Sequence, residues 1–450
     1  MAAKFVDAIA HMPGMDGEDS DATGAYTQTT FGPECPITWI TLPKERWPKA
    51  WHNIYTDPKN PPVVILSTNL YGHPLAGLYW GNYCEEKMLK CGFFKVKGWE
   101  CLYMHKEKGL ILSVYVDDFK MGGIAGNIGP MWEKLKLHLD LDPPVKLKSN
   151  VYLGMKQSSC PISQEIVQEK NELFNEIFGS RTYDHQGIEK PTTDSKKEGG
   201  SSDGLSKNAL RRQRKRAGEA VLQDRSAGRN AWPDSKSCAS KPHFSGYQYD
   251  LTGNAADCVS RYLELSGKKI SDLKQAATPC FDDSQLPPED MLTKGELSAD
   301  ASKIVLKCLW IARLTRPDIL WTVNFLARNI TKWDVACDKR LYRLICYIHH
   351  TKDYVLTCFV GDHPWDCQLI MYADASFAGD VVDSKSTTGG YLFLIGPNTC
   401  VPLGHMVKKQ GAVSHSSTEA EVIALDACLR VDGIPALMFW EQAFFAQRKF

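Results

Sequence analysis

The sequence predicts an α+β fold, because segments with strand-like alternation and segments with helical spacing follow one another along most of the chain. In the first 155 residues the expected order is strand, helix, hairpin, helix and strand, with acidic residues on two central strands. This order is typical of an antiparallel sheet with helices on one face. A later strand-rich segment from residue 361 onward, closed by a helix, predicts a second unit with α/β character.

Local patterns define the elements of the first unit. Leu75, Leu78 and Tyr79 fall at helical spacing after Pro74, which suits a first helical turn. The run 110–116 is rich in β-branched residues and predicts a strand that pairs with 93–104 across a Lys-Glu-Lys-Gly turn. The first twenty residues, rich in Met and Asp, are expected to be poorly structured. A helix with Trp132, Leu135 and Leu139 on one side and a short strand over 151–155 complete the set, with Asp-Pro-Pro at 142–144 between them.

Composition limits the class of protein. A length of 450 residues suggests about three units at ~150 residues each. The hydrophobic content of 43%, the charged content of 24% and the net charge of zero are ordinary for a soluble protein, so any contact with nucleic acid must depend on local basic patches. The fifteen cysteines include no C-x-x-C pair and suggest neither a zinc ribbon nor a disulfide framework. No membrane segment or signal peptide is expected, which favours an intracellular location in the cytoplasm or nucleus.

The chain is organised around the apolar strand that leads to Asp117 and Asp118. Two adjacent carboxylates are costly to desolvate, so a cation or solvent must offset their charge. At the tip of a hairpin one of them can reach outward to hold a metal ion. A solvated Asp-Asp turn without function is the alternative interpretation of this motif.

The rest of the chain divides by composition. Residues 176–250 have few apolar residues and no periodicity, which predicts a disordered linker, and its Arg/Lys block at 211–216 could bind nucleic acid, act as a nuclear signal or simply be solvated. Helices are expected over 258–265, 301–314, 317–326 and 338–350. Strands are expected from 369, over 391–395 and over 400–403, and a helix begins near Ser416, which has capping-box spacing to Glu419. We divide the chain into 1–175, 176–250, 251–360 and 361–450.

Four motifs resemble those of copia-type retrotransposon reverse transcriptases and stand in the same order. They are Asp-x-x-Gly-Ala-Tyr at 21–26, Leu-Tyr-Gly-x-x-x-Ala-Gly-x-x-Trp at 70–80, Tyr-Val-Asp-Asp at 115–118 and Tyr-Leu-Gly at 152–154. The resemblance implies a polymerase palm (1–175) with the fingers largely missing, a helical thumb and connection (251–360), and an RNase H-like domain (361–450) that ends before its third carboxylate. It therefore leaves RNase H activity doubtful.

The resemblance also assigns roles to individual residues. Asp21, Asp117 and Asp118 correspond to the polymerase carboxylates, with Asp118 the less essential, and Asp374 and Glu419 to metal ligands of the RNase H domain. Nucleotide- and primer-binding roles fall on Tyr71, Gly72, Ala76, Gly77, Tyr115, Tyr152 and Gly154. Tyr115 could equally be a half-buried strand residue, Tyr152 and Gly154 could serve sheet packing, and Glu419 could be a helix cap.

The function implied is RNA-directed DNA synthesis with an attached RNase H domain. Two Mg²⁺ ions, or Mn²⁺ in their place, would be held by carboxylates during nucleotidyl transfer, because hard cations prefer oxygen ligands. The implied partners are an RNA template, a DNA primer, their hybrid, dNTPs and the remaining parts of a Pol polyprotein, with no membrane. The alternative is a truncated, non-catalytic retroelement remnant that at most binds RNA or DNA.

Overall fold

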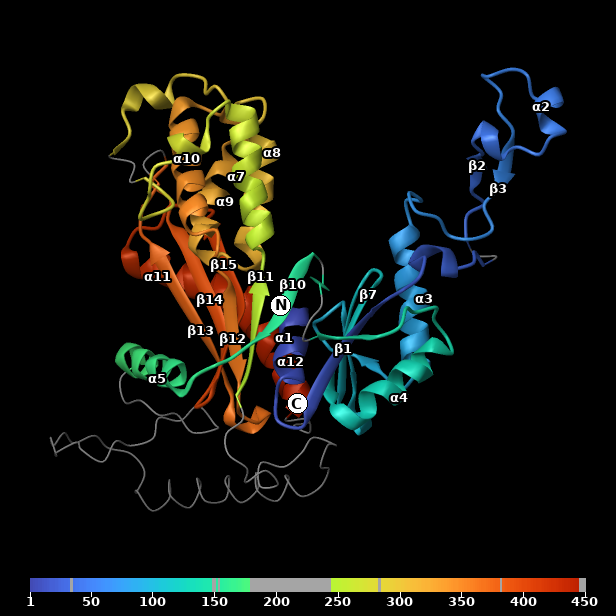
Figure 1. Cartoon of the computed structure of the whole chain (residues 1–450), viewed down its shortest axis with the longest axis horizontal. Helices are drawn as coiled ribbons and strands as arrows, with labels where there is room; N and C mark the ends of the chain where they lie inside the picture. The colour runs from blue at the N-terminus through green and yellow to red at the C-terminus, as the bar shows by residue number, and fades with distance from the viewer. Residues whose placement is uncertain are drawn as a thin grey trace, which may run out of the picture.

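The computed structural model describes residues 1–32, 35–147, 151–152, 154–178, 244–281, 285–380 and 383–444. It confirms a mixed helix and sheet architecture of the α+β kind, built around two large antiparallel sheets that lie side by side (Figure 1). No helix in these ranges is both long and apolar enough to cross a membrane.

The first sheet has six strands in the order β4-β5-β6-β7-β1-β8. Its strands are β1 (Met15–Asp21), β4 (Phe94–Lys95), β5 (Leu102–His105), β6 (Leu110–Tyr115), β7 (Asp118–Ile124) and β8 (Val145–Lys146). The predicted hairpin over 110–116 and its pairing with the preceding strand are confirmed, since Leu110 lies opposite His105. The central pair β1 and β7 is antiparallel and places Asp21 opposite Asp118.

Helices cover both faces of this sheet, rather than the one face that the sequence predicted. Helices α3 (Ala76–Lys90) and α4 (Ala125–Lys136) pack on one face against Leu112, Phe119 and Met121. Helix α1 (Ala2–Ala10) packs on the other face through Phe5 and Ile9.

The expectation that the first twenty residues are poorly structured is therefore wrong. They form α1 and most of β1. Although this segment is rich in acidic residues, it also has apolar side chains at helical spacing. Of these, Phe5, Val6 and Ile9 are completely buried. The helix lies close against β7 at Gly122, which has no side chain. A Cβ atom at this position would lie 2.9 Å from the carbonyl oxygen of Val6, so a larger residue would push the helix away.

The second sheet has seven strands in the order β13-β14-β15-β12-β11-β10-β9. They are β9 (Val151–Tyr152), β10 (Met155–Cys160), β11 (Ser245–Asp250), β12 (Leu356–Val360), β13 (Gln368–Ser376), β14 (Thr387–Gly396) and β15 (Thr399–Lys409). Strands from all four predicted segments therefore share one sheet, and the division of the chain into domains at those boundaries stays a prediction.

Strand β11 lies in the range for which the sequence predicts a linker. Tyr247 and Tyr249 are two residues apart on the strand, so they point to the same face of the sheet, and both are completely buried. Their burial explains why this short segment pairs with β10 and β12, although the neighbouring sequence is polar. At the other end of the linker range, residues 176–178 finish helix α5 (Gln164–Phe178). The Arg/Lys block at 211–216 lies outside the described residues.

Four helices stand at one end of the second sheet: α7 (Thr252–Ser266), α8 (Ala301–Leu314), α9 (Leu320–Arg328) and α10 (Val335–His350) (Figure 1). The predicted helix over 301–314 is confirmed in full. The C-terminal end of α7 is set by Gly267, whose φ of 67° favours glycine. Helix α11 (Ser417–Cys428) packs on β13 and β14, and α12 (Ile434–Phe444) follows a short π-helical turn.

A buried polar cluster joins the two sheets. The Nζ atom of Lys120 on β7 lies 2.9 Å from a carboxylate oxygen of Asp7 on α1, and both side chains are 1% exposed. The hydroxyl of Tyr249 on β11 donates to the other oxygen of Asp7 at 2.6 Å. The same Lys120 ammonium lies 4.0 Å from the ring centroid of Tyr152 on β9. One carboxylate thus connects α1, the first sheet and the second sheet.

We predict that Lys120→Met strongly destabilises the fold. A buried charge that loses its partner keeps its desolvation cost, so the free energy of unfolding should fall by about 3 kcal/mol, measured by urea denaturation. Lys90→Met is the matched control, because it breaks the solvent-exposed pair with Glu86 and should leave the free energy of unfolding nearly unchanged. Equal effects of the two substitutions would contradict the structural role of the buried pair.

Candidate functional site

The two adjacent aspartates lie at a tight turn between β6 and β7. Tyr115 is paired with Asp118 across the hairpin, so Val116 and Asp117 form a two-residue loop. Val116 has a φ of 57°, which is unusual for a β-branched residue and marks local strain. Two bonds hold the loop: Trp80 Nε1 of α3 donates to the carbonyl of Val116 at 2.6 Å, and the backbone N–H of Ala22 donates to the carbonyl of Asp117 at 2.7 Å.

Asp21 and Asp118 meet at this end of the sheet. Their carboxyl groups come close enough to share a proton, and the pKa of each is raised from the usual value of 3.8. Burial is the main cause at both positions, followed for Asp21 by the charge of Asp117 and for Asp118 by the charges of Asp21, Asp117 and Asp19. The pKa of Asp118 rises to about 6. The structure therefore brings together the three carboxylates that the sequence singled out.

Asp21, Asp117 and Asp118 together form what we call the acidic site. Its possible metal ligands are all carboxylate oxygens, the type of ligand that Mg²⁺ prefers. Like charges this close repel one another unless a proton or a cation intervenes, and this repulsion adds to burial in raising the two pKa values. In the ranges that the structure describes, no group of three or more His, Cys, Asp or Glu side chains is placed so that it could hold a metal ion. The three residues fit the chemistry of a divalent cation, but their side chains do not yet form a ligand shell.

The segment at the start of α3 lies beside the acidic site. The ring of Tyr71, which is 54% exposed, packs on Tyr26 with centroids 4.6 Å apart. Gly72 has a φ of 96°, a conformation that favours glycine, whereas Gly77 borders open space. Ala76 is buried at the first position of the helix.

Sequence reasoning missed Asn69, which fixes this segment. Its side chain is completely buried, its Nδ2 donates to the carbonyl of Ala76 at 2.9 Å, and its Oδ1 accepts from the N–H of Leu70 at 3.0 Å. A buried asparagine that hydrogen-bonds two backbone groups fixes the conformation of the segment. The sequence does not show that this residue is buried, so its role could be recognised only in the structure.

The other predicted primer-binding residues differ in exposure. Tyr115 is 57% exposed beside the acidic turn, so its ring is accessible. Tyr152 is buried against Lys120, which matches the sheet-packing alternative. Gly154, with a φ of 74°, forms the turn between β9 and β10 and lies near Trp310 of α8, whose ring would be 4.0 Å from an added Cβ.

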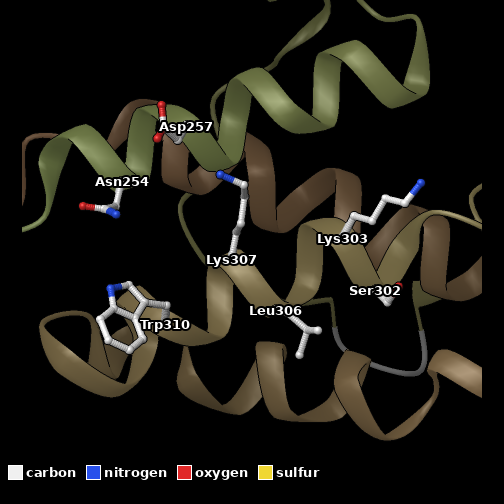
Figure 2. A pocket seen from close by; sticks show the side chains of 7 residues that line it. All are labelled: Asn254, Asp257, Ser302, Lys303, Leu306, Lys307 and Trp310. Atoms are coloured by element: carbon white, nitrogen blue, oxygen red, sulfur yellow. The ribbon is translucent and has the colours of Figure 1, made fainter. Parts of the chain in front are cut away.

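Trp310 belongs to an open groove between α7 and α8. The groove is lined by Asn254, Asp257, Ser302, Lys303, Leu306, Lys307 and Trp310. Figure 2 shows Lys307 extending from α8 toward α7. Two lysines and a half-exposed tryptophan are typical of a surface that contacts phosphates and bases.

The second pair of predicted ligands, Asp374 and Glu419, lies in the other sheet. Asp374 is exposed on β13, and Glu419 is in the first turn of α11, which packs on that strand. The Ser416 hydroxyl oxygen accepts from the N–H of Glu419 at 3.1 Å, and the Glu419 carboxylate accepts from the N–H of His415 at 2.7 Å. Glu419 therefore acts as a cap in this structure, and its role as a ligand stays a prediction.

We predict that Asp118→Asn stabilises the chain at neutral pH in the absence of divalent cations. Because the pKa of Asp118 is about 6 when folded, against an ordinary 3.8, the free energy of unfolding falls as the pH rises between these values. Replacing this carboxylate should therefore raise the free energy of unfolding by about 1 kcal/mol at pH 7.5, after allowance for solvent screening. The increase should become smaller as the pH approaches 4. Urea denaturation with EDTA at several pH values measures this, with the exposed Asp353→Asn as control. A pH-independent difference would contradict the raised pKa of Asp118.

Comparison with known proteins shows which proteins the chain resembles. No protein-family model matches the chain. A stretch of 117 residues, 26% of the chain, is 33% identical to the secreted RxLR effector protein 161 of Plasmopara viticola and covers 78% of that protein. A stretch of 181 residues, 40% of the chain, is 29% identical to the retrovirus-related Pol polyprotein from transposon RE2 of Arabidopsis thaliana.

The matched part makes up 11% of the RE2 polyprotein, so the chain spans only a small share of that relative. Two further retrovirus-related Pol polyproteins match at 35% and 29% identity over 24% and 37% of the chain. Among solved structures, a foamy viral protease-reverse transcriptase in complex with an RNA/DNA hybrid aligns over 96% of this chain and 57% of that one. Its sequence identity is 10% and its TM-score 0.23, too low to establish a shared fold. The chain belongs to the same protein family as the Plasmopara viticola protein, and it is also similar to retrovirus-related Pol polyproteins.

Proposed function

We propose that the chain is a retroelement-derived nucleic-acid-binding protein whose acidic site extends a DNA primer on an RNA template. The observation that carries the proposal is the pairing of Asp21 with Asp118 beside Asp117, three carboxylates at a strained turn. The Pol polyprotein relatives support the retroelement origin.

Each part of the site has a role in this proposal. Asp21, Asp117 and Asp118 would hold Mg²⁺, which when bound neutralises phosphate charge and lowers the pKa of the primer 3′-hydroxyl. The exposed ring of Tyr115 would contact the primer end. Tyr71 and the start of α3 at Gly72, Ala76 and Gly77 would form the wall of the nucleotide pocket. The groove between α7 and α8 would carry the nucleic-acid backbone past the Gly154 turn.

Two other assignments follow the resemblance. Asp374 and Glu419 would contribute to hybrid cleavage, with one Glu419 oxygen as a metal ligand while the other accepts from the N–H of His415. A second candidate function is a protein that binds RNA or DNA without catalysis, and it is favoured because no group of three or more His, Cys, Asp or Glu side chains among the described residues is placed to hold a metal ion.

We predict that divalent cation binding depends on the acidic pair. Mg²⁺ should raise the melting temperature of the native chain, because a ligand that binds only the folded state stabilises it. The same addition should have little effect on a variant with Asp21→Asn and Asp118→Asn, while Asp353→Asn should respond like the native chain. Differential scanning fluorimetry with and without Mg²⁺ measures this without requiring activity. An equal shift in all three proteins would place the cation elsewhere.

The catalytic proposal is tested by primer extension on an RNA template with dNTPs and Mg²⁺. The native chain should extend the primer, and Asp117→Asn should lower the rate by at least about 100-fold, because the site loses one charge that offsets the cations. Asp353→Asn should extend normally. Absence of extension by a folded native chain that still binds the template would favour the non-catalytic candidate.

A further inference from the structure

An arm of about thirty residues projects from the first sheet. It contains β2 (Trp39–Thr41), β3 (Val63–Ile65) and the short helix α2 (Trp51–Ile54), and it extends away from the rest of the chain (Figure 1). Strands β2 and β3 form a two-stranded sheet of their own. Within residues 36–65, all of which the structure describes, Pro62 alone is buried.

Such an arm has little to stabilise it. An isolated two-stranded ribbon is marginally stable in water, because it buries too little apolar surface to offset the ordering of its backbone. One face of the ribbon nevertheless carries a row of exposed apolar side chains. Trp39 lies opposite Ile65, with 58% and 56% of their surfaces exposed, and Val63 on the same face is 50% exposed. An indole ring left on a free surface in this way is available to another molecule.

The charges of the arm indicate what that molecule is. The segment 36–65 contains four basic residues, Lys44, Arg46, Lys49 and Lys59, and two acidic residues, Glu45 and Asp57, whereas the whole chain has zero net charge. Within the described ranges none of the four basic side chains forms an ion pair. All four are exposed and can reach a polyanion.

Aromatic rings accompany these charges. Between Lys44 and Lys59 the rings of Trp47, Trp51 and Tyr55 pack on one another, with Trp51 and Tyr55 centroids 5.8 Å apart. Basic side chains interleaved with aromatic rings bind single strands, because the cations follow the phosphates and the unpaired bases stack on the rings.

We infer that this arm binds a single-stranded polynucleotide, through base stacking on Trp39 and phosphate contacts with Lys44, Arg46 and Lys49. The inference rests on the proposed function in its choice of nucleic acid as partner, but it requires no catalysis. It adds a contact surface separate from the acidic site and from the groove between α7 and α8.

The test is fluorescence anisotropy of a labelled 12-nucleotide single-stranded RNA of mixed, non-self-complementary sequence, titrated with the full chain at several salt concentrations. Trp39→Ala should weaken binding at least about fivefold, from the loss of one stacked base. The triple variant Lys44→Ala, Arg46→Ala, Lys49→Ala should reduce the slope of log K against log salt by about 2.

Matched controls remove equivalent groups elsewhere. Tyr354→Ala deletes a ring that is 57% exposed, and the triple variant Lys274→Ala, Lys294→Ala, Lys352→Ala deletes three exposed charges. Both should bind the RNA nearly as the native chain does. Because the arm buries so little, its variants should keep the native melting temperature.

Unchanged RNA binding by the arm variants, while the native chain binds, would overturn the inference and leave the proposed function intact. Binding that depends on the arm in a chain without primer extension would support the inference and count against the polymerase. Dissociation of a native dimer by the arm variants, without loss of RNA binding, would assign the arm to a second copy of the chain. A native chain that binds no single strand would overturn both proposals.

Discussion

The buried ion pair between Asp7 and Lys120 is the constraint on which the arrangement of the two sheets depends. Neither charge can be exposed to water without separating α1 from β7, and Tyr249 ties the same carboxylate to the second sheet. Buried pairs of this kind contribute little net stability but penalise every arrangement that breaks them. Lys120 also lies two residues after Asp118 on the same strand, so the pair that joins the sheets also fixes the strand that carries the acidic site.

In the acidic site, unlike at Asp7, the negative charges are not compensated by a neighbouring cation. At Asp7 a negative charge is buried with a cation and a hydroxyl donor, whereas Asp21 and Asp118 face each other with no basic partner among the groups that shift their pKa values. The turn adds strain at Val116, which the Trp80 and Ala22 hydrogen bonds hold in place. Strain and repulsion at an accessible end of a sheet, where Tyr115 is 57% exposed, are typical of a functional site and not of a stabilising one.

Local patterns could be predicted from the sequence, and long-range pairings could not. The hairpin that leads to Asp117, the helix over 301–314 and the cap at Ser416 depend on neighbouring residues, and the structure contains all three. The pairing of β10 with β11 joins segments more than eighty residues apart, and no local signal encodes it. For the same reason, Asp21 could be linked to Asp118 only through the order of motifs, and the roles of Asn69 and Lys120 became visible only with their burial.

A chain with zero net charge can attract a polyanion only where its charges are separated in space. The arm and the groove between α7 and α8 present lysine and arginine with aromatic rings, while the acidic site repels phosphate until a cation neutralises it. These surfaces respond to different ions. Monovalent salt screens the basic surfaces and weakens contacts with the backbone, whereas a divalent cation is what makes the acidic site accessible to a phosphate. A nucleic acid bound to the arm, as we infer, would therefore be held at a distance from Asp21 and Asp118 until a cation lets a phosphate approach them.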